Sequence, residues 1–532
     1  MQLSFSRVVV FTGDLGYTVR RNIVDLDERI PGLSWLVLVH SPRKTVGRLL
    51  RSQWLNLRKN GWRWIPYQTK DLLVRLMPEP DGESVTDAPG ACYEMAALKA
   101  RQNLQICYVG DIHGDESLTL LREFAPDLGL SLAAPILKPS VFDQPRLGTI
   151  NLHKGKLPEF RGMPPAFWEL WTGQTEVGCS VHRINEKLDE GPLLKSGVVP
   201  RQRYSTQRGL QWALDEMGSR LVCDVAEALL QGRELVATQP KGEARTWRKP
   251  SLAQRAELDR RLATQAPKWP HGARVALKHM VMWTAFAWHR LLGWRLSAPR
   301  VTVLLYHRVC DDARDNLSVG IEQFDRQMAL LKRHCRLLPI EQVLAMDTIP
   351  RSRRPWVAVS FDDGYLDNWA YAAPILRRHG VPCSFYVSTG IVDREDGRFP
   401  HDVRRGNALI PVMKWDHLRQ LCSWGFTVGS HTANHIDCVT EDEARVRAEL
   451  QDSKADIVRE LGLDTPVFAY PYGGRHQMNA SRLALVRETG YSACLAAYGG
   501  SNIGHVNRWN VLRRGIHWEF TDRAFLYQCL GH

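Results

Sequence analysis

The stretch Trp356-Val-Ala-Val-Ser-Phe-Asp-Asp-Gly364 decides the fold of the second half of the chain. Residues 356–361 form a short apolar run of the kind found in a buried strand, and two carboxylates and a glycine follow it directly. Neighbouring side chains of a strand point to opposite faces, so a bend at its end lets both Asp362 and Asp363 reach one pocket. Two carboxylates beside a cation can divide their roles, because one binds the ion while the other holds a proton.

Two further motifs follow this strand in the sequence. The stretch Gly429-Ser-His-Thr-Ala-Asn-His435 places His431 and His435 four residues apart. On a helical turn they would share one face and could chelate one metal ion. The stretch Phe468-Ala-Tyr-Pro-Tyr-Gly473 is irregular and could point a backbone N–H at a developing oxyanion. Each motif alone is weak evidence, whereas the ordered set within one domain is specific.

This ordered set resembles the polysaccharide deacetylase family, carbohydrate esterase family four, from Val301 almost to the end of the chain. The resemblance implies a distorted (β/α) barrel and metal-dependent hydrolysis of an N-acyl group. It implies that Asp362 is the general base and that a divalent metal is bound by Asp363, His431 and His435. Zinc is the first expectation for this metal, although other divalent ions fit such a site.

The remaining roles in this half also come from the resemblance. The backbone amide of Tyr472 is expected to help hold the oxyanion, and a protonated histidine is expected to release the amine. The sequence departs from the family because Ala469 and Tyr470 precede Pro471, where an arginine is usual. Leu304-Leu-Tyr-His307 matches the acid motif of circularly permuted members, so His307 is the preferred acid and His517 the competitor.

Both halves alternate short apolar runs with amphipathic stretches, which is typical of an α/β fold. In the first half we predict strands at Val8–Phe11, Trp35–His40, Ile106–Val109 and Thr149–Leu152, and a helix at Ser205–Leu230. In the second half we predict strands at Thr302–Tyr306, Trp356–Phe361, Cys383–Val387 and Thr427–Gly429, and a helix at Glu441–Leu461.

The first half carries a second candidate site in Ile150-Asn-Leu-His-Lys-Gly-Lys-Leu-Pro158. Asn151 and His153 lie two residues apart, so on a strand both side chains project to one side. Asp189 follows 189 − 153 = 36 residues after the histidine and could orient its imidazole. An amide, an imidazole and a carboxylate fit acyl transfer to an amine, because the amide donates to the oxyanion and the other two manage the proton.

With the adjoining LPEFRGMPP and LDEGP segments, this pattern resembles the 10-formyltetrahydrofolate-dependent formyltransferase family, most closely over Phe124–Leu194. The resemblance implies a Rossmann-like domain in which Asn151, His153 and Asp189 are the catalytic trio. It implies folate contacts at Leu157, Pro158 and Gly162. One departure is Lys-Gly-Lys at 154–156, whose lysines we expect to affect the KM for an anionic substrate or for folate.

The 532-residue chain is long enough for two or three domains of roughly 100–200 residues. We place a formyltransferase-like domain at 1–251, a basic, tryptophan-rich helical connector at 252–299 and the deacetylase domain at 300–532. Two interpretations of the connector stay open. In the first, it is a helix sandwiched between the domains. In the second, residues 275–295, which include Trp283, Trp288 and Trp294, form an interfacial helix on an anionic membrane.

Composition limits the partners and the compartment. The net charge of +13 fits anionic partners, but no recognised nucleic-acid motif occurs, so no nucleic acid is expected. The eleven cysteines are scattered without a CxxC pair, which argues against a disulfide framework and a thiolate zinc site. No secretory signal and no long apolar span stand out, so we expect a cytoplasmic protein, with the inner face of the membrane as the alternative location.

Together these patterns predict a bifunctional enzyme of amino-sugar, polysaccharide or lipid-linked glycan metabolism. One half would remove an N-acyl group, acetyl or formyl, and the other would formylate a sugar amine with 10-formyltetrahydrofolate. The substrate is expected to be a nucleotide-linked or lipid-linked amino sugar. The alternative is a deacetylase joined to a catalytically inactive formyltransferase-like binding module.

Overall fold

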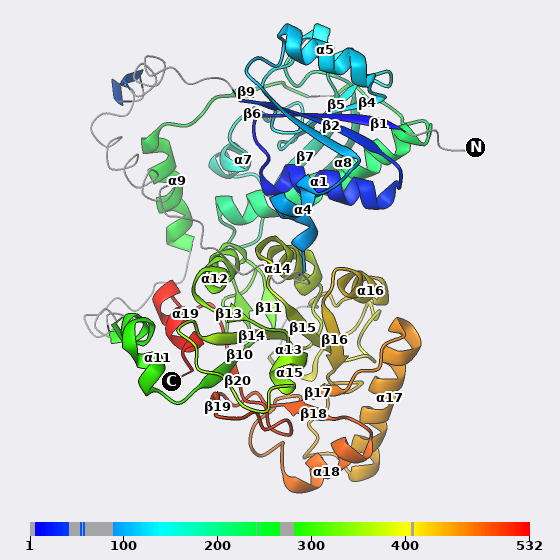
Figure 1. Ribbon diagram of the computed structural model, residues 1–532. Helices are drawn as coiled ribbons and strands as arrows, with labels where there is room; N and C mark the ends of the chain where they lie inside the picture. Colours follow the sequence, from blue (N-terminus) through cyan, green and yellow to red (C-terminus); the bar gives the residue numbers. More distant parts are fainter. Residues whose placement is uncertain are drawn as a thin grey trace. The chain divides into compact units, whose positions relative to one another are not determined.

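The computed structural model describes residues 6–41, 54–55, 57–58, 89–240, 242–265, 281–282, 284–405 and 409–531. The chain divides into two compact units (Figure 1). Unit 1 comprises residues 1–80 and 92–266, and unit 2 comprises residues 81–91 and 267–532. The boundary at 266 and 267 falls within the predicted connector.

Unit 1 is built on a seven-stranded sheet in the order β3-β2-β1-β4-β5-β7-β8. The strands are β1 (Arg7–Thr12), β2 (Ser34–His40), β3 (Leu104–Val109), β4 (Leu128–Ser131), β5 (Thr149–His153), β7 (Glu176–Arg183) and β8 (Leu193–Pro200). The first five run parallel, whereas β7 and β8 are antiparallel to their neighbours. The predicted α/β architecture and its Rossmann-like order are confirmed.

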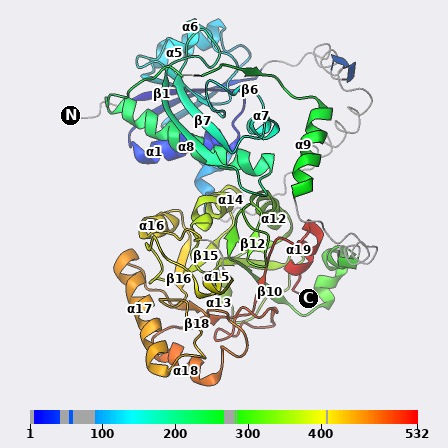
Figure 2. The same cartoon turned by 180° about the vertical axis from the view of Figure 1, so that it is seen from behind.

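Helices cover both faces of this sheet, which explains why its central strands β1 and β2 are continuous apolar runs rather than alternating ones (Figures 1 and 2). The helices are α1 (Tyr17–Arg29), α4 (Met95–Lys99), α5 (Asp115–Phe124), α6 (Pro139–Phe142), α7 (Phe167–Trp171), α8 (Gln207–Leu230) and α9 (Leu252–Gln265). Helices α5 and α6 pack on Val9, Phe11 and their neighbours, while α1 and α8 pack together on the other side. Helix α8 starts after Thr206, whose side chain accepts a hydrogen bond from the N–H of Gly209.

Unit 2 is built on a curled, mainly parallel sheet in the order β18-β17-β16-β15-β14-β10. These strands are β10 (Arg300–Tyr306), β14 (Trp356–Phe361), β15 (Cys383–Val387), β16 (Thr427–Ser430), β17 (Val467–Ala469) and β18 (Ala493–Leu495). Three short strands also join it: β13 (Arg336–Leu337) pairs with β14, while β19 (Asn502–Ile503) and β20 (Arg513–Gly515) pair with β10. Strand β20 pairs in parallel with β10, and Val511 just before it bridges to Leu495 of β18, so the sheet curls round into a distorted barrel.

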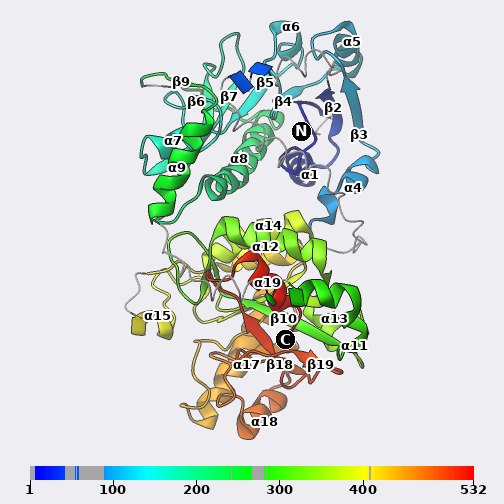
Figure 3. The same cartoon turned by 90° about the vertical axis from the view of Figure 1, so that its left-hand side faces the viewer.

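Helices surround this curled sheet (Figures 1 and 2). They are α12 (Ile321–His334), α13 (Ile340–Leu344), α14 (Ala373–His379), α15 (Pro400–Arg405), α16 (Trp415–Ser423), α17 (Glu443–Leu461), α18 (Ala480–Glu488) and α19 (Asp522–Cys529). Helix α15 stands out from the body of the unit in Figure 3. In a barrel of parallel strands the active site lies at the carboxyl ends of the strands, and there the predicted carboxylates and histidines of this half follow β10, β14 and β16.

Part of the predicted connector lies outside the described residues, including 266–280 and Trp283. Residues 284–288 are helical, and they continue into a π-helical turn at His289–Gly293 and a short helix α11 at Trp294–Leu296. Phe286 is buried against Leu526 and Leu530. Trp288, Leu291 and Leu292 are exposed. In the described parts of the chain, no helix has the length and apolar content needed to span a membrane.

Candidate active sites

The two adjacent carboxylates of unit 2 lie directly after β14, as predicted. Asp363 has a φ of 75° and Gly364 a φ of 102°, so the backbone bends sharply where the strand ends. Strained non-glycine conformations of this kind persist where the surrounding structure fixes them, and they gather at functional sites. The N–H of Asp362 donates to the carbonyl of Tyr306 at 3.1 Å, which ties the bend to the neighbouring strand β10. Both carboxylates are buried.

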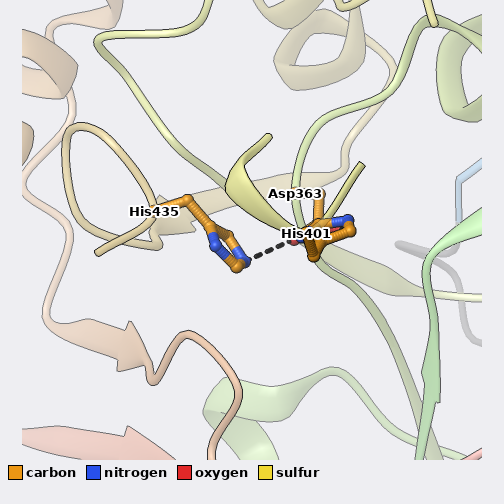
Figure 4. Close-up of side chains that lie close together, drawn as sticks. All are labelled: Asp363, His401 and His435. Carbon is orange, nitrogen blue, oxygen red and sulfur yellow. Dashed lines mark ion pairs between the residues drawn. The ribbon is translucent and has the colours of Figure 1, made fainter. Parts of the chain in front are cut away.

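Three histidines converge on Asp363. The Nε2 atoms of His431 and His435 lie 3.4 and 3.1 Å from its Oδ1, and the Nε2 of His401 lies 3.7 Å from its Oδ2. One ligand atom each of Asp363, His401 and His435 falls within 4.8 Å of the others (Figure 4). His401 comes from α15, which carries no recognisable motif, and the sequence analysis did not identify it.

The expectation that His431 and His435 share a helical turn is wrong. The two residues lie in an irregular loop after β16, where Thr432 and His435 have φ values of 61° and 53°. Left-handed backbone at these two non-glycine residues, rather than a helical repeat, turns both imidazoles toward one carboxylate. The predicted ligand set is nevertheless brought together.

The donor set fits a divalent cation. Both Asp363 oxygens and the Nδ1 of His435 are buried, and no described residue forms a hydrogen bond with them. The Nδ1–H of His431 donates to the carbonyl of Ala469 at 2.7 Å, so its Nε2 lone pair faces Asp363. Burial disfavours charge here, yet the imidazoles of His431 and His435 hold the pKa of Asp363 well below its usual range. A carboxylate with imidazole nitrogens around it is a ligand set typical of zinc and similar metals.

Asp362 has a partner that the sequence analysis did not identify. The Arg513 guanidinium donates to both oxygens of Asp362, at 2.6 and 2.7 Å, and the two side chains are fully buried. Arg513 also donates to the carbonyl of Ala496 at 2.8 Å, which fixes its position. Burial alone would raise the pKa of Asp362, but Arg513, together with the imidazoles of His431 and His307, more than offsets this effect and lowers it. Strand β20, which completes the barrel, thus supplies an arginine that the third motif lacks.

The two candidate acids differ in their surroundings. His307 follows β10, and the charges of Asp363 and Asp362 oppose the burial that lowers its pKa. His517 follows β20, where its Nδ1 lies 3.8 Å from Glu519 and its ring contacts Phe520. The structure therefore brings His307 to the two carboxylates, whereas the charged neighbours of His517 lie elsewhere.

Tyr472 borders this site on another side. Its ring centroid lies 5.0 Å from that of His435, and its hydroxyl accepts a hydrogen bond of 2.8 Å from Arg404. The backbone has a φ of 60° at this residue, and no described residue accepts a hydrogen bond from its N–H. That donor is therefore available for an oxyanion, which is the role expected of it.

The predicted trio of unit 1 is assembled on β5 and the segment after β7. The Nδ1 of His153 lies 3.5 Å from Oδ2 of Asp189. The Nε2–H of His153 donates to the carbonyl of Phe160 at 2.7 Å, so Nδ1 is the nitrogen that can accept a proton next to Asp189. Burial lowers the pKa of His153, and Asp189 opposes this shift only in part. Asp189 itself has a φ of 53°.

A second histidine, His182 of β7, joins this trio and was missed. It pairs with Asn151 across the antiparallel strands β5 and β7. Its Nδ1–H donates to the carbonyl of Arg183 at 2.9 Å, so its Nε2 accepts a hydrogen bond of 3.1 Å from the Asn151 amide. His182 thereby fixes which way the amide faces. The alternation in Cys179–Arg183 predicts which face His182 occupies, but the register that places it opposite Asn151 cannot be predicted from the sequence.

The Lys-Gly-Lys segment at 154–156 follows β5. Lys154 forms an ion pair with Asp215, and Lys156 donates to Glu176 at 2.7 Å, so both lysines already have carboxylate partners within unit 1. Gly155 fits a close approach, because a Cβ there would lie 2.3 Å from the carbonyl oxygen of Phe160 and 2.6 Å from Nε2 of His153. The departure from the family pattern therefore has a local structural explanation.

The residues expected to contact folate lie beside the trio. Leu157 and Pro158 follow the lysines and are buried. Gly162, with a φ of 92°, donates its N–H to Asp189, and a Cβ there would lie 2.2 Å from the carbonyl oxygen of Trp247. Their role as a folate site stays a prediction.

Two family models match separate parts of the chain. The formyl transferase model matches residues 111–225, and the polysaccharide deacetylase model matches residues 350–494. The methionyl-tRNA formyltransferase of Desulfovibrio desulfuricans is 30% identical over 176 residues, which are 32% of this chain and 52% of that protein. The same enzyme of Geobacillus thermodenitrificans is 33% identical over 147 residues, which are 27% of this chain and 46% of that protein. The chain thus spans about half the length of these relatives.

Solved structures also show likeness to parts of the chain. A Streptococcus pyogenes deacetylase in complex with acetate is 21% identical, with a TM-score of 0.37 over 44% of this chain and 99% of that one. A 4-N formyltransferase from Francisella tularensis is 12% identical, with a TM-score of 0.30 over 47% of this chain and 77% of that one. The family models include the trio of unit 1 and the Asp-His-His set of unit 2. The chain therefore matches the formyl transferase family over residues 111–225 and the polysaccharide deacetylase family over residues 350–494.

Proposed function

We propose that the chain is a bifunctional enzyme that removes an N-acyl group from an amino sugar and formylates a sugar amine. The observation that supports this most directly is the presence of two separate and complete sets of catalytic groups. One set lies around Asp362 and Asp363 in unit 2, and the other lies around His153 and Asp189 in unit 1.

In the deacetylase site, Asp363, His431 and His435 would hold a divalent metal, with zinc favoured. When bound, such a metal polarises the amide carbonyl and makes water more acidic. Asp362 is kept ionised by Arg513 and would accept the proton of the attacking water. The N–H of Tyr472 would donate to the oxyanion, and His307 would give a proton to the leaving amine.

In the formyltransferase site, 10-formyltetrahydrofolate would supply the formyl group. The side-chain amide of Asn151 would donate to the oxyanion formed when the amine attacks the formyl carbon. Nδ1 of His153 would accept the proton that the amine loses, and Asp189 would stabilise the resulting imidazolium. We assign the folate contacts to Leu157, Pro158 and Gly162, which lie next to this trio.

The two reactions are chemically compatible in one order. Hydrolysis of an N-acetyl group creates a free amine, and a free amine is the nucleophile that formyl transfer needs. The reverse order, formylation followed by deformylation, is the second candidate. A nucleotide-linked or lipid-linked amino sugar is the proposed substrate class for both reactions. All the cysteines are present as thiols, which supports a reducing cytoplasm as the compartment.

The experiment that tests this proposal is a mass-spectrometric screen of nucleotide-linked and lipid-linked amino sugars. Each substrate is incubated with the full-length protein, 10-formyltetrahydrofolate and a divalent metal. The expected products differ from the substrate by loss of an acyl group, by gain of formyl, or by both. Loss of an acyl group without any formyl product would instead support an inactive formyltransferase-like binding module.

A further inference from the structure

We propose that His401 is an additional protein ligand of the metal in the deacetylase site, which rests on the proposed metal-dependent function. The predicted ligands all come from segments that follow strands of the barrel. His401 comes instead from α15, and its Nε2 lies 3.7 Å from Oδ2 of Asp363. His431 and His435 approach the other oxygen of the same carboxylate. The imidazoles therefore surround one carboxylate whose two oxygens have no hydrogen-bond donor among the described residues.

Several contacts hold His401 against the site. Its ring stacks on Phe399, with ring centroids 5.5 Å apart and an interplanar angle of 17°, and Phe399 packs with Tyr365 in a small buried apolar cluster. The ring also contacts that of His435 edge to face, with centroids 5.0 Å apart. Three residues along the chain, Arg404 donates to the Tyr472 hydroxyl at 2.8 Å. The segment is thus attached on both sides of the site.

The nitrogen of His401 that is proposed to bind the metal has a hydrogen-bond partner in the absence of metal, namely the Tyr365 hydroxyl. The Tyr365 hydroxyl donates to Oδ2 of Asp402 at 2.7 Å and lies 2.8 Å from Nε2 of His401. Because the hydroxyl proton goes to Asp402, the tyrosine oxygen can accept only from a protonated Nε2 in the absence of metal. On metal binding the imidazole proton would reside on Nδ1, while Tyr365 keeps its bond to Asp402. The cost of freeing Nε2 is then one hydrogen bond.

A third imidazole has a chemical consequence for metal choice. Imidazole nitrogens favour zinc, cobalt and nickel, whereas magnesium and calcium prefer oxygen ligands. With one carboxylate and three imidazoles from the protein, the site would discriminate against magnesium more strongly than a site with two imidazoles. The reacting water would then need a position beyond the four protein ligands, which zinc and cobalt can provide by expanding their coordination.

The test uses metal-free, full-length protein and Co²⁺ as the probe, followed by visible absorption and by calorimetric titration. The proteins compared are the wild type, His401→Gln, His401→Ala, His431→Ala and, as a matched control, His505→Ala, which removes an exposed histidine. We expect both His401 variants to bind Co²⁺ at least about tenfold more weakly, since even outer partners of ligands cost 10–100-fold. We also expect a changed visible spectrum in both, and no change in His505→Ala.

The outcomes separate this inference from the proposed function. Wild-type affinity and an unchanged spectrum in both His401 variants, with binding lost in His431→Ala, would overturn the role of His401 and leave the metal site standing. Absence of Co²⁺ binding in the wild type would overturn the metal site itself. A wild-type urea unfolding transition of unit 2 in every variant shows that this unit is folded when the comparison is made.

Discussion

Replacing Arg513 by methionine should remove the buried cation that is hydrogen-bonded to Asp362, the proposed base of the deacetylase. In the wild type, two short charge-assisted hydrogen bonds join Arg513 to Asp362, and both side chains are inaccessible to solvent. Removing one partner of such a pair leaves the other charge buried and uncompensated, which costs about 3–5 kcal/mol. We expect Arg513→Met to lower the free energy of unfolding of unit 2 by an amount in this range and to lower hydrolysis strongly.

The pH dependence of this effect has a definite sign. The pKa of Asp362 in the folded protein lies below its usual value, which for an aspartate in an unfolded chain is about 3.9. The stabilisation from the ion pair is therefore complete above that value and is lost as the pH falls through the folded pKa. The stability difference between Arg513→Met and the wild type should be full at neutral pH and should narrow in acid. The acid limb of kcat/KM should move to higher pH in the variant.

The assay is urea unfolding from pH 3 to 8, with deacetylation and formyl transfer measured on the same samples. Arg514→Met is the matched control, because Arg514 donates to the carbonyl of Gly500 and to Gln528 rather than to the site. A double-mutant cycle with Asp362→Asn should give a coupling energy above about 0.5 kcal/mol. If Arg513→Met and Arg514→Met have the same unfolding energies and the same pH profiles, the proposed role of Arg513 is refuted.

Three further predictions concern the other parts of the chain. Asp363→Ala should remove bound metal and hydrolysis together while formyl transfer persists, as measured by metal analysis and by assays of the two activities. Unfolding of unit 1 when the metal is chelated would contradict this prediction. His153→Ala should lower formyl transfer by ~10²–10⁴-fold with little change in folate binding. Because burial lowers the pKa of His153, the acid limb of the pH–rate profile of wild-type formyl transfer should lie below the ordinary histidine pKa of about 6.5. If residues 275–295 form an interfacial helix, Leu291→Glu with Leu292→Glu should abolish co-sedimentation with anionic phospholipid vesicles and spare both activities; unchanged sedimentation would favour the sandwiched helix.

Four strands of each unit could be predicted from the sequence because they are short apolar runs, and the clearest of them, Val8–Phe11 and Trp356–Phe361, are almost entirely buried. Helices α8 and α17 could be predicted in the same way from their helical periodicity. The candidate ligands and the formyl-transfer trio were accessible because each lies within a short local motif. In each of these cases the residues that form the pattern are close in sequence, so the pattern can be recognised without knowledge of the tertiary structure.

The groups that were missed depend on tertiary structure. Arg513 reaches Asp362 only because β20 completes the barrel 151 residues later in the chain. His401 reaches Asp363 from a helix with no motif, and His182 reaches Asn151 through a strand register. The helical turn assumed for His431 and His435 failed because left-handed backbone at non-glycine residues has no reliable sequence signal.

The central claim is that one chain removes an acyl group and adds a formyl group at two independent sites. It is tested most directly by following an N-acetylated amino-sugar substrate from the screen by mass spectrometry, with formyl-labelled 10-formyltetrahydrofolate. The wild type should convert it to the labelled N-formyl product, His153→Ala should accumulate the free amine, and Asp363→Ala should leave the substrate unchanged. Labelled product from His153→Ala, or loss of acetyl in Asp363→Ala, would contradict the account.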